Sequence, residues 1–323
     1  MRCQVGGSFF SEDDYAARKA VRTANAAPTF AYHAATSTKP IDEQKAHPSL
    51  DPKGLKVRES RDSKEHPNSN AVIFAFDVTG SMTTFPKIAQ AKLPTLMGLL
   101  LRKGFLEDPQ IMVCAFGDQA CDVAPLQAGQ FESGIEIEDD ITNLLLVGGG
   151  GGQFSESPEL VFYLAAKKTS IDCFEKRNKK GYLFLITDEK GRSLTPNVLK
   201  DVFGEGGEES FTIKQIIEEA QKLYDVYVIT PKGTSHAGNP ELKQYWTELL
   251  GQNYLQLDEP EAICELVAST IGICENTIGD LRDNLAETGL SKSGIDAVTT
   301  ALAKTGTGSS VSKVPKDSGL VSI

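Results

Sequence analysis

Short apolar segments alternate with helix-like segments over residues 71–279, and this alternation constrains the fold more than any other feature of the sequence. The apolar segments have the length of a β-strand and are bounded by polar residues or glycine: residues 71–76, 111–116, 182–187, 226–230 and 254–257. The helix-like segments cover residues 87–102, 158–169, 212–223, 241–250 and 261–278. Nearly all-apolar strands alternating with helices are typical of a parallel sheet covered on both faces. We therefore predict a doubly wound, Rossmann-like α/β fold with a mainly parallel sheet.

The segments outside this region suggest a chain in three parts. Residues 1–70 hold one short helix-like stretch and are otherwise rich in proline, serine, asparagine and charge, which predicts a largely irregular N-terminal arm. Residues 280–323 are expected to form a last helix followed by a low-complexity tail. Within the central part, Pro94 should kink or divide the helix over residues 87–102, because proline lacks an amide donor and crowds the preceding turn.

Charge and hydropathy exclude several classes of partner. The longest apolar run, residues 96–101, is far shorter than the roughly 20 residues that cross a bilayer, so no membrane association is expected. Residues 71–279 carry 17 basic and 30 acidic side chains, so the net charge of the whole chain, −11, lies in its middle. This charge argues against nucleic acid as a partner and favours a bound cation or a basic protein surface.

Cysteine and histidine are assigned no chemistry. The 6 cysteines are scattered without a Cys-x-x-Cys pair, and the first residues lack the apolar segment of a secretion signal. We therefore expect reduced, mostly buried thiols and a cytoplasmic location. The four histidines, His33, His47, His66 and His236, fall in expected loops without metal-ligand spacing, which predicts solvent-exposed side chains.

The loop after the first predicted strand carries a dense group of oxygen donors. Residues 77–82 read Asp-Val-Thr-Gly-Ser-Met, which places Asp77, Thr79 and Ser81 on one tight turn. Open parallel sheets bind ligands beyond the carboxyl ends of their strands, and Mg²⁺ and Mn²⁺ prefer oxygen ligands. The turn therefore predicts a Mg²⁺ or Mn²⁺ site. Alternatively, the same side chains would only cap the next helix.

The stretch AVIFAFDVTGSM resembles the first strand and metal-ion-dependent adhesion site of von Willebrand factor A (VWA) domains. The signature of that site is Asp-x-Ser-x-Ser, in which Thr79 replaces the first serine and keeps its hydroxyl. The order of elements over residues 71–279 is similar to the domain, and the form Asp-x-Thr-Gly-Ser-Met resembles its intracellular members. The acidic loop ITDEKG stands where the family has a metal-binding Asp, so the resemblance implies Asp188 as a further ligand.

The third element of a VWA site is a threonine that follows glycines and precedes a helix. Residues 148–160 read GGGGGQFSESPEL, where Gln153, Ser155, Glu156 and Ser157 are the available substitutes for the missing threonine. The Glu-Ser-Pro-Glu stretch resembles the Asp-x-Pro-Glu of A-type domains attached to some atypical kinases, which favours Glu156 with Ser155 nearby. The expected metal ligands are therefore Asp77, Thr79, Ser81, Ser155, Glu156 and Asp188.

The resemblance implies recognition without catalysis. In the VWA geometry the hydroxyls of Thr79 and Ser81 bind the ion directly, Asp77 and Asp188 act wholly or partly through water, and a carboxylate of a partner protein completes the site. The function implied is a metal-dependent scaffold or adaptor in an intracellular assembly. Bacterial proteins of this family often work beside AAA+ ATPases of the MoxR or chelatase type, which the resemblance implies as partners here.

Two alternatives to this function remain open at the level of the sequence. The first is a structural subunit that has the fold without a working metal site. The second is a Mg²⁺-dependent phosphohydrolase of the haloacid dehalogenase type, with Asp77 as the nucleophile and Asp188 or Glu189 as the metal carboxylate. That family has a second Asp two positions after the first, where this chain has Thr79, and this difference argues against the enzyme.

Overall fold

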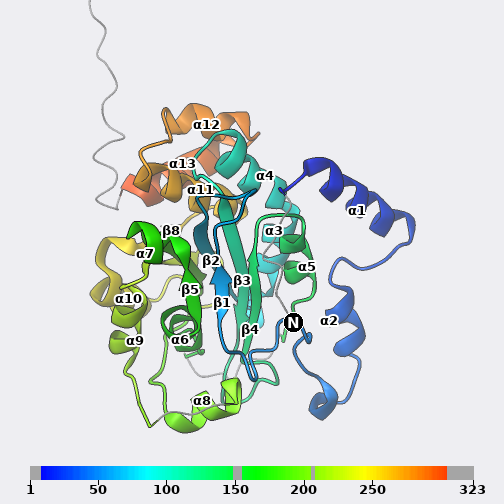
Figure 1. Cartoon of the computed structure of the whole chain (residues 1–323), viewed down its shortest axis with the longest axis vertical. Coiled ribbons are helices and arrows are strands. Elements are labelled where there is room, and N and C mark those ends of the chain that lie inside the picture. The colour runs from blue at the N-terminus through cyan, green and yellow to red at the C-terminus, as the bar shows by residue number, and fades with distance from the viewer. Residues whose placement is uncertain (1–8, 148–154, 205–207, 304–323) are drawn as a thin grey trace, which may run out of the picture.

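A six-stranded sheet forms the centre of the computed structural model, which describes residues 9–147, 155–204 and 208–303 (Figure 1). The strands lie in the order β4-β3-β2-β6-β7-β8, and all neighbours are parallel except β3 and β4. Their bounds are β2 Asn70–Asp77, β3 Pro109–Phe116, β4 Leu126–Glu132, β6 Gly181–Ile186, β7 Tyr224–Pro231 and β8 Tyr254–Leu257. The predicted doubly wound, mainly parallel fold is confirmed.

Strand β2 divides the core into two apolar layers. Phe74 and Phe76 pack into one cluster and Ile73 and Ala75 into the other, because successive side chains of a strand point to opposite faces. The helices that contribute to the first cluster are α1 Glu12–Ala24, α3 Phe85–Ala91, α4 Leu93–Met97, α5 Glu136–Thr142, α11 Ile263–Cys274, α12 Leu281–Glu287 and α13 Lys292–Ala303. Those of the second are α6 Glu159–Lys167, α7 Asp172–Arg177, α8 Pro196–Phe203, α9 Ile213–Ala220 and α10 Pro240–Leu250.

The edge strand β4 was not among the predicted strands. Its sequence, LQAGQFE, interrupts the apolar pattern with glutamine and glycine. The Gln127 side chain is nevertheless fully buried, since its amide donates to the carbonyl of Leu145 at 2.8 Å and its carbonyl accepts from the Leu145 amide at 2.8 Å. A buried glutamine is tolerated only when such partners exist, and a distant loop supplies them here.

The predicted division of the first long helix is confirmed. α3 ends at Ala91 and α4 begins at Leu93, with Pro94 in the first turn of α4, where its missing amide costs least. A π-helical turn, Gly98–Arg102, follows directly.

The glycine-rich loop and the predicted low-complexity tail fall largely within residues 148–154 and 304–323, outside the described part of the chain. No helix in the described ranges is long and apolar enough to cross a membrane.

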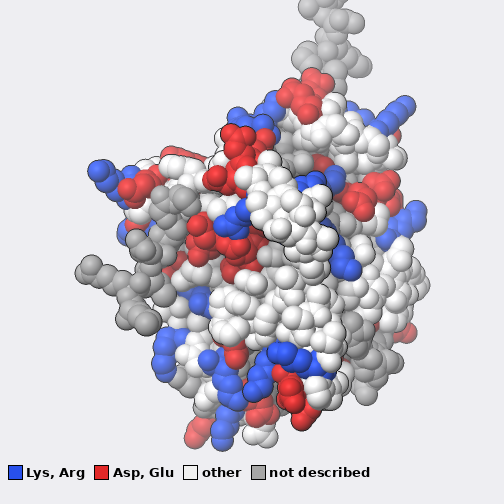
Figure 2. Space-filling view, turned by 90° about the vertical axis from the view of Figure 1, so that its right-hand side faces the viewer, with Lys and Arg blue, Asp and Glu red and all other residues white. Residues whose placement is uncertain are grey.

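The segment before β2 contacts the domain through a helix and a strand. β1 Arg58–Ser60 pairs in parallel with β5 Thr169–Ile171. Helix α1 Glu12–Ala24 packs through Tyr15, whose hydroxyl donates to the carbonyl of Gln90 at 2.8 Å. α2 Ala31–Thr36 follows it, and Figure 2 shows the side of the molecule that carries both helices, where charged groups surround an uncharged central area.

An ion pair with a buried partner also fixes α1. Arg22 donates to Oε1 of Glu138 at 2.5 Å, and the Glu138 side chain is fully buried. The side-chain amide of Gln90 donates to the same oxygen at 2.8 Å. Because a buried carboxylate without donors is costly, this pair contributes more than a pair on the surface.

Replacing Arg22 by alanine is expected to lower the free energy of unfolding by about 2 kcal/mol, the usual cost of removing a hydrogen bond to a charged buried group. The matched control is Arg282→Ala, because Arg282 pairs with Asp296 where both side chains are about half exposed. That change is expected to cost less than about 0.5 kcal/mol. Urea unfolding measures both, and equal effects would show that α1 is not fastened through Glu138.

Candidate metal centre

The predicted site residues lie at the carboxyl edge of the sheet. β2 ends at Asp77 and the adjacent parallel strand β6 ends at Ile186, with Phe76 opposite Ile186 in the register. The turns that follow the two strands therefore begin side by side. In the first turn Gly80 adopts φ +42°, a left-handed conformation that favours glycine, and a short 3₁₀ helix, Gly80–Thr84, follows.

Asp77 is held by hydroxyl groups from both turns. The Thr79 hydroxyl donates to Oδ1 at 2.6 Å, the Thr79 amide donates to the same oxygen at 2.9 Å, and the Thr187 hydroxyl donates to Oδ2 at 2.9 Å. The Asp77 side chain has no exposed surface. Burial, together with the charge of Asp188, raises the pKa of Asp77 to about 7 although the three hydrogen bonds oppose this shift.

Ser81 and Asp188 are joined by a third loop, residues 232–239 between β7 and α10. The Ser235 amide and hydroxyl each lie 3.2 Å from the Ser81 hydroxyl oxygen. The next amide, that of His236, donates to Oδ2 of Asp188 at 2.8 Å. Two consecutive backbone amides therefore contact two predicted ligands, which places the turns after β2, β6 and β7 in one cluster.

The substitutes for the missing threonine differ in how they are engaged. Gln153 lies outside the described residues. Ser157 is buried and its hydroxyl accepts from the Gln119 amide at 3.0 Å. Ser155 is half-buried, and its carbonyl accepts from Arg192 at 2.6 Å.

Glu156 is the substitute that retains an unengaged oxygen. It is 2% exposed, and its Oε2 has no hydrogen-bond partner among the residues that the structure describes. Burial and the charges of Asp77 and Asp118 raise its pKa to about 8. The choice of Glu156 as third ligand stays a prediction, and the structure places its carboxyl group in the same electrostatic cluster as Asp77.

Glu189 and His236 also belong to this cluster; sequence reasoning gave Glu189 a metal role only in the phosphohydrolase alternative and gave His236 none. His236 Nδ1 lies 2.8 Å from Oε1 of Glu189, and ligand atoms of Asp188, Glu189 and His236 all lie within 4.8 Å of one another. The prediction that the histidines are solvent-exposed is wrong for His66, which is 1% exposed. His236 is partly buried beside the acids. The only available signal was its place in the loop after a parallel strand.

The charge of the cluster fits a divalent cation. Burial and neighbouring acids raise the pKa of Glu189 to about 8, as they raise those of Asp77 and Glu156. Arg192 lies nearby, but its guanidinium binds Asp118, with Nη2 at 2.9 Å from Oδ2. A concentration of oxygen donors whose charged forms are disfavoured without a cation is the chemistry that Mg²⁺ and Mn²⁺ bind.

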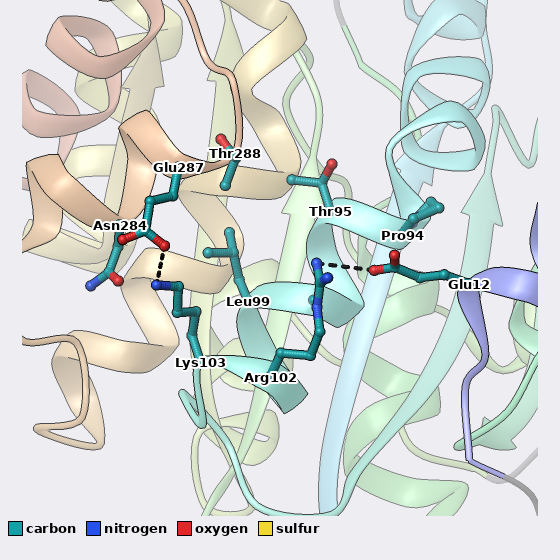
Figure 3. Close-up of a pocket in the computed structure, with 10 residues that line it drawn as sticks. Glu12, Pro94, Thr95, Leu99, Arg102, Lys103, Asn284, Glu287 and Thr288 are labelled. Atoms are coloured by element: carbon teal, nitrogen blue, oxygen red, sulfur yellow. Dashed lines mark hydrogen bonds and ion pairs between the residues drawn. The ribbon is translucent and has the colours of Figure 1, made fainter.

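A separate pocket of about 490 Å³ lies between α1, α4, the π-helical turn and α12 (Figure 3). Arg102 pairs with Glu12 at 3.0 Å, and Lys103 pairs with Glu287. In Figure 1, α4 and α12 lie near the top, whereas α8, which follows the Asp188 loop, lies at the bottom. Each basic side chain of this pocket already contacts a carboxylate, and we assign the pocket no ligand.

Comparison with known proteins finds no related sequence and only low structural similarity. No family model matches the chain, and no curated protein matches its sequence. The structure is similar to the open pilus adhesin SpaC from Lactobacillus rhamnosus GG, with 10% identity and a TM-score of 0.44, over 67% of this chain and 31% of that one. It is also similar to proximal thread matrix protein 1 from the mussel byssus, with 12% identity and a TM-score of 0.38, over 66% of this chain and 48% of that one.

The chain thus spans less than half the length of either of these proteins, and neither similarity assigns it a function.

The raised pKa of Asp77 predicts that the protein in chelator loses stability as the pH rises. The folded state keeps this proton up to about pH 7, whereas the unfolded chain releases it near pH 4, so stability falls between these values. The slope from one such group is at most about 1.4 kcal/mol per pH unit. Asp77→Asn should show a shallower decline in urea unfolding between pH 5 and pH 7.

The matched control for this measurement is Asp201→Asn, because Asp201 is an exposed carboxylate on α8. It is expected to keep the full pH dependence of the unchanged protein. If the stability of Asp77→Asn declined with pH as steeply as that of the control, the inference that Asp77 is protonated in the folded state would be wrong.

Proposed function

We propose that the chain is a VWA-like interaction module that binds Mg²⁺ or Mn²⁺ and, through the ion, a carboxylate of a partner protein. The observation that carries the proposal is the convergence of Asp77, Thr79, Ser81 and Asp188 at one edge of the sheet. The carboxyl group of Glu156, whose charged form is disfavoured without a cation, accompanies them. The role in this proposal is that of a scaffold or adaptor in a larger assembly.

The residues that would hold the ion divide into hydroxyls and carboxylates. Thr79 and Ser81 offer hydroxyl oxygens, Asp77 and Asp188 offer carboxylates, and Glu156 with Ser155 nearby would supply the third element. The ion would act as a Lewis acid that binds an Asp or Glu side chain of the partner. Thr79 is suited to its role because its proton is directed to Asp77, which leaves lone pairs on its oxygen.

The environment of Asp77 favours binding over phosphoryl transfer. A nucleophilic carboxylate needs an accessible oxygen, whereas Asp77 is fully buried and both of its oxygens accept hydrogen bonds. This arrangement suits a residue that positions Thr79 and a bound ion. The structural subunit without a metal site is the remaining alternative, and metal binding distinguishes it from the proposal.

The partner and the compartment are proposed from the resemblance alone. An AAA+ ATPase of the MoxR type is the partner class that the intracellular VWA proteins imply, and the cytoplasm is the corresponding location. The acidic central region, with a net charge of −13 over residues 71–279, suits a basic surface around the partner's carboxylate and disfavours nucleic acid. We propose no membrane partner.

Metal binding is expected to stabilise the protein. Mg²⁺ or Mn²⁺ at one hundred times its dissociation constant should raise the free energy of unfolding by about 2.7 kcal/mol, because the ion binds only the folded state. The double variant Asp77→Ala with Ser81→Ala should lose this response, and Asp201→Ala, an exposed carboxylate, should keep it. Thermal unfolding in chelator and in millimolar Mg²⁺ measures the effect. A response that survives in the double variant would place the ion elsewhere.

Capture of a carboxylate has a direct test with a small probe. Acetate should bind the open position of the Mn²⁺-loaded protein, and its methyl protons should relax faster because the paramagnetic ion is near. Methylammonium, which carries no carboxylate, is the matched probe and should not respond. The Asp77→Ala with Ser81→Ala variant should reduce the acetate effect to that of free Mn²⁺ under the same conditions. Equal relaxation of the two probes would contradict carboxylate recognition.

A further inference from the structure

We propose that Asp188, Glu189 and His236 form a second cation site, which takes a transition-metal ion of the Zn²⁺ class through the imidazole of His236. The site goes beyond the proposed function, because Asp77, Thr79 and Ser81 are not part of it. Asp188 is shared, so the two ions would lie on either side of one carboxylate. No sequence motif marks this site, since its residues come from the loops after two different strands.

The geometry brings three ligand atoms of the right kinds together. One imidazole nitrogen and two carboxylate oxygens lie within 4.8 Å of one another, and the Nδ1 to Oε1 distance between His236 and Glu189 is 2.8 Å. Zn²⁺ binds such atoms at about 2.0–2.2 Å, so small side-chain rotations bring all three onto one ion. The remaining positions of the ion would be open to water or to a partner's side chain.

A buried, unengaged oxygen points independently to a ligand. Glu189 is 7% exposed, and its Oε2 has no hydrogen-bond partner within the described part of the chain. The other oxygen, Oε1, already faces His236. A buried carboxylate oxygen without a donor is unfavourable, and a bound cation removes that cost. A simple His236–Glu189 ion pair leaves Oε2 unsatisfied.

Hydrogen bonds to the backbone of Glu189 and His236 fix their loops without using the Glu189 carboxylate or the imidazole. The indole nitrogen of Trp246 donates to the backbone carbonyl of Glu189 at 3.0 Å. The Asn239 amide donates to the carbonyl of His236 at 2.9 Å, which fixes the turn before α10. Asp188 accepts the His236 amide through Oδ2, and the ion would bind through its other oxygen. Such supporting contacts orient metal ligands and lower the cost of binding.

The ligand set selects the class of ion. Mg²⁺ prefers oxygen ligands alone, whereas an imidazole with carboxylates suits Zn²⁺ and Co²⁺. The two sites can therefore be probed separately in the same chain. Mg²⁺ reports the site at Asp77, and Zn²⁺ or Co²⁺ reports the site at His236.

The test uses the full chain with Zn²⁺ and Co²⁺ as probes. The sequence has 4 histidines, so each imidazole proton resonance can be assigned from its loss in the corresponding His→Gln variant. Zn²⁺ should shift the resonances of His236 and leave those of His47, which contacts Ser49 and Tyr32 and belongs to no acidic cluster of the described residues. In His236→Gln, Zn²⁺ affinity by calorimetry should fall at least tenfold, and the visible absorption of bound Co²⁺ should change. His47→Gln is the matched control and should bind as the unchanged protein does.

A second variant tests the site without altering the loop that carries His236. Glu189→Gln keeps the size of the side chain and a carbonyl oxygen facing His236, and it should also weaken Zn²⁺ binding at least tenfold. Equal Zn²⁺ affinity in the unchanged protein and in both variants would overturn the second site. Zn²⁺ binding that depends on Asp77 and not on His236 would overturn it too, because the ion would then occupy the first site.

The results separate the second site from the proposed function. A Zn²⁺ response lost in His236→Gln, together with no Mg²⁺ response, would support the second site and overturn the Mg²⁺-dependent module. A Mg²⁺ response lost in Asp77→Ala, together with Zn²⁺ binding insensitive to His236→Gln, would do the reverse. Near-ultraviolet circular dichroism of each variant confirms that the fold is unchanged.

Discussion

The parallel pairing of β2 with β6 is the constraint on which the site depends. It places Phe76 opposite Ile186, so Asp77 and Thr187 leave the sheet side by side and their side chains meet. The hydrogen bond from Thr187 to Asp77 then orients the start of both turns. A strand order that did not place β2 beside β6 would separate Asp77 from Asp188, although the residues of each turn would be unchanged.

This pairing concentrates carboxylates where water is excluded. Asp77, Glu156 and Glu189 all have raised pKa values, because burial and mutual repulsion disfavour their charged forms. A core built for stability alone would not keep three such groups together. Clusters of acids with shifted pKa values are typical of functional sites. The loop with Ser235 and His236 contacts this cluster through hydrogen bonds to Ser81 and Asp188.

Much of the fold was predictable from the sequence, because buried parallel strands are short, nearly all-apolar segments. β2, β3, β6, β7 and β8 were found in this way, and Pro94 marked the division of α3 from α4. β4 was missed because its Gln127 is polar and breaks the apolar pattern. The structure buries this side chain through two hydrogen bonds with the backbone of Leu145. A satisfied polar group in a core leaves no local signal, because its partner lies elsewhere in the chain.

The sequence by itself determined the class of fold and the turn from Asp77 to Ser81, since both follow from local patterns of apolar and oxygen-bearing residues. Only the tertiary structure decided which carboxyl groups lie together, that Glu156 has an oxygen without a partner among the described residues, and that His236 lies against Glu189. These residues come from loops after different strands. Their proximity depends on the strand order and register of the sheet, which bring together residues far apart in the chain.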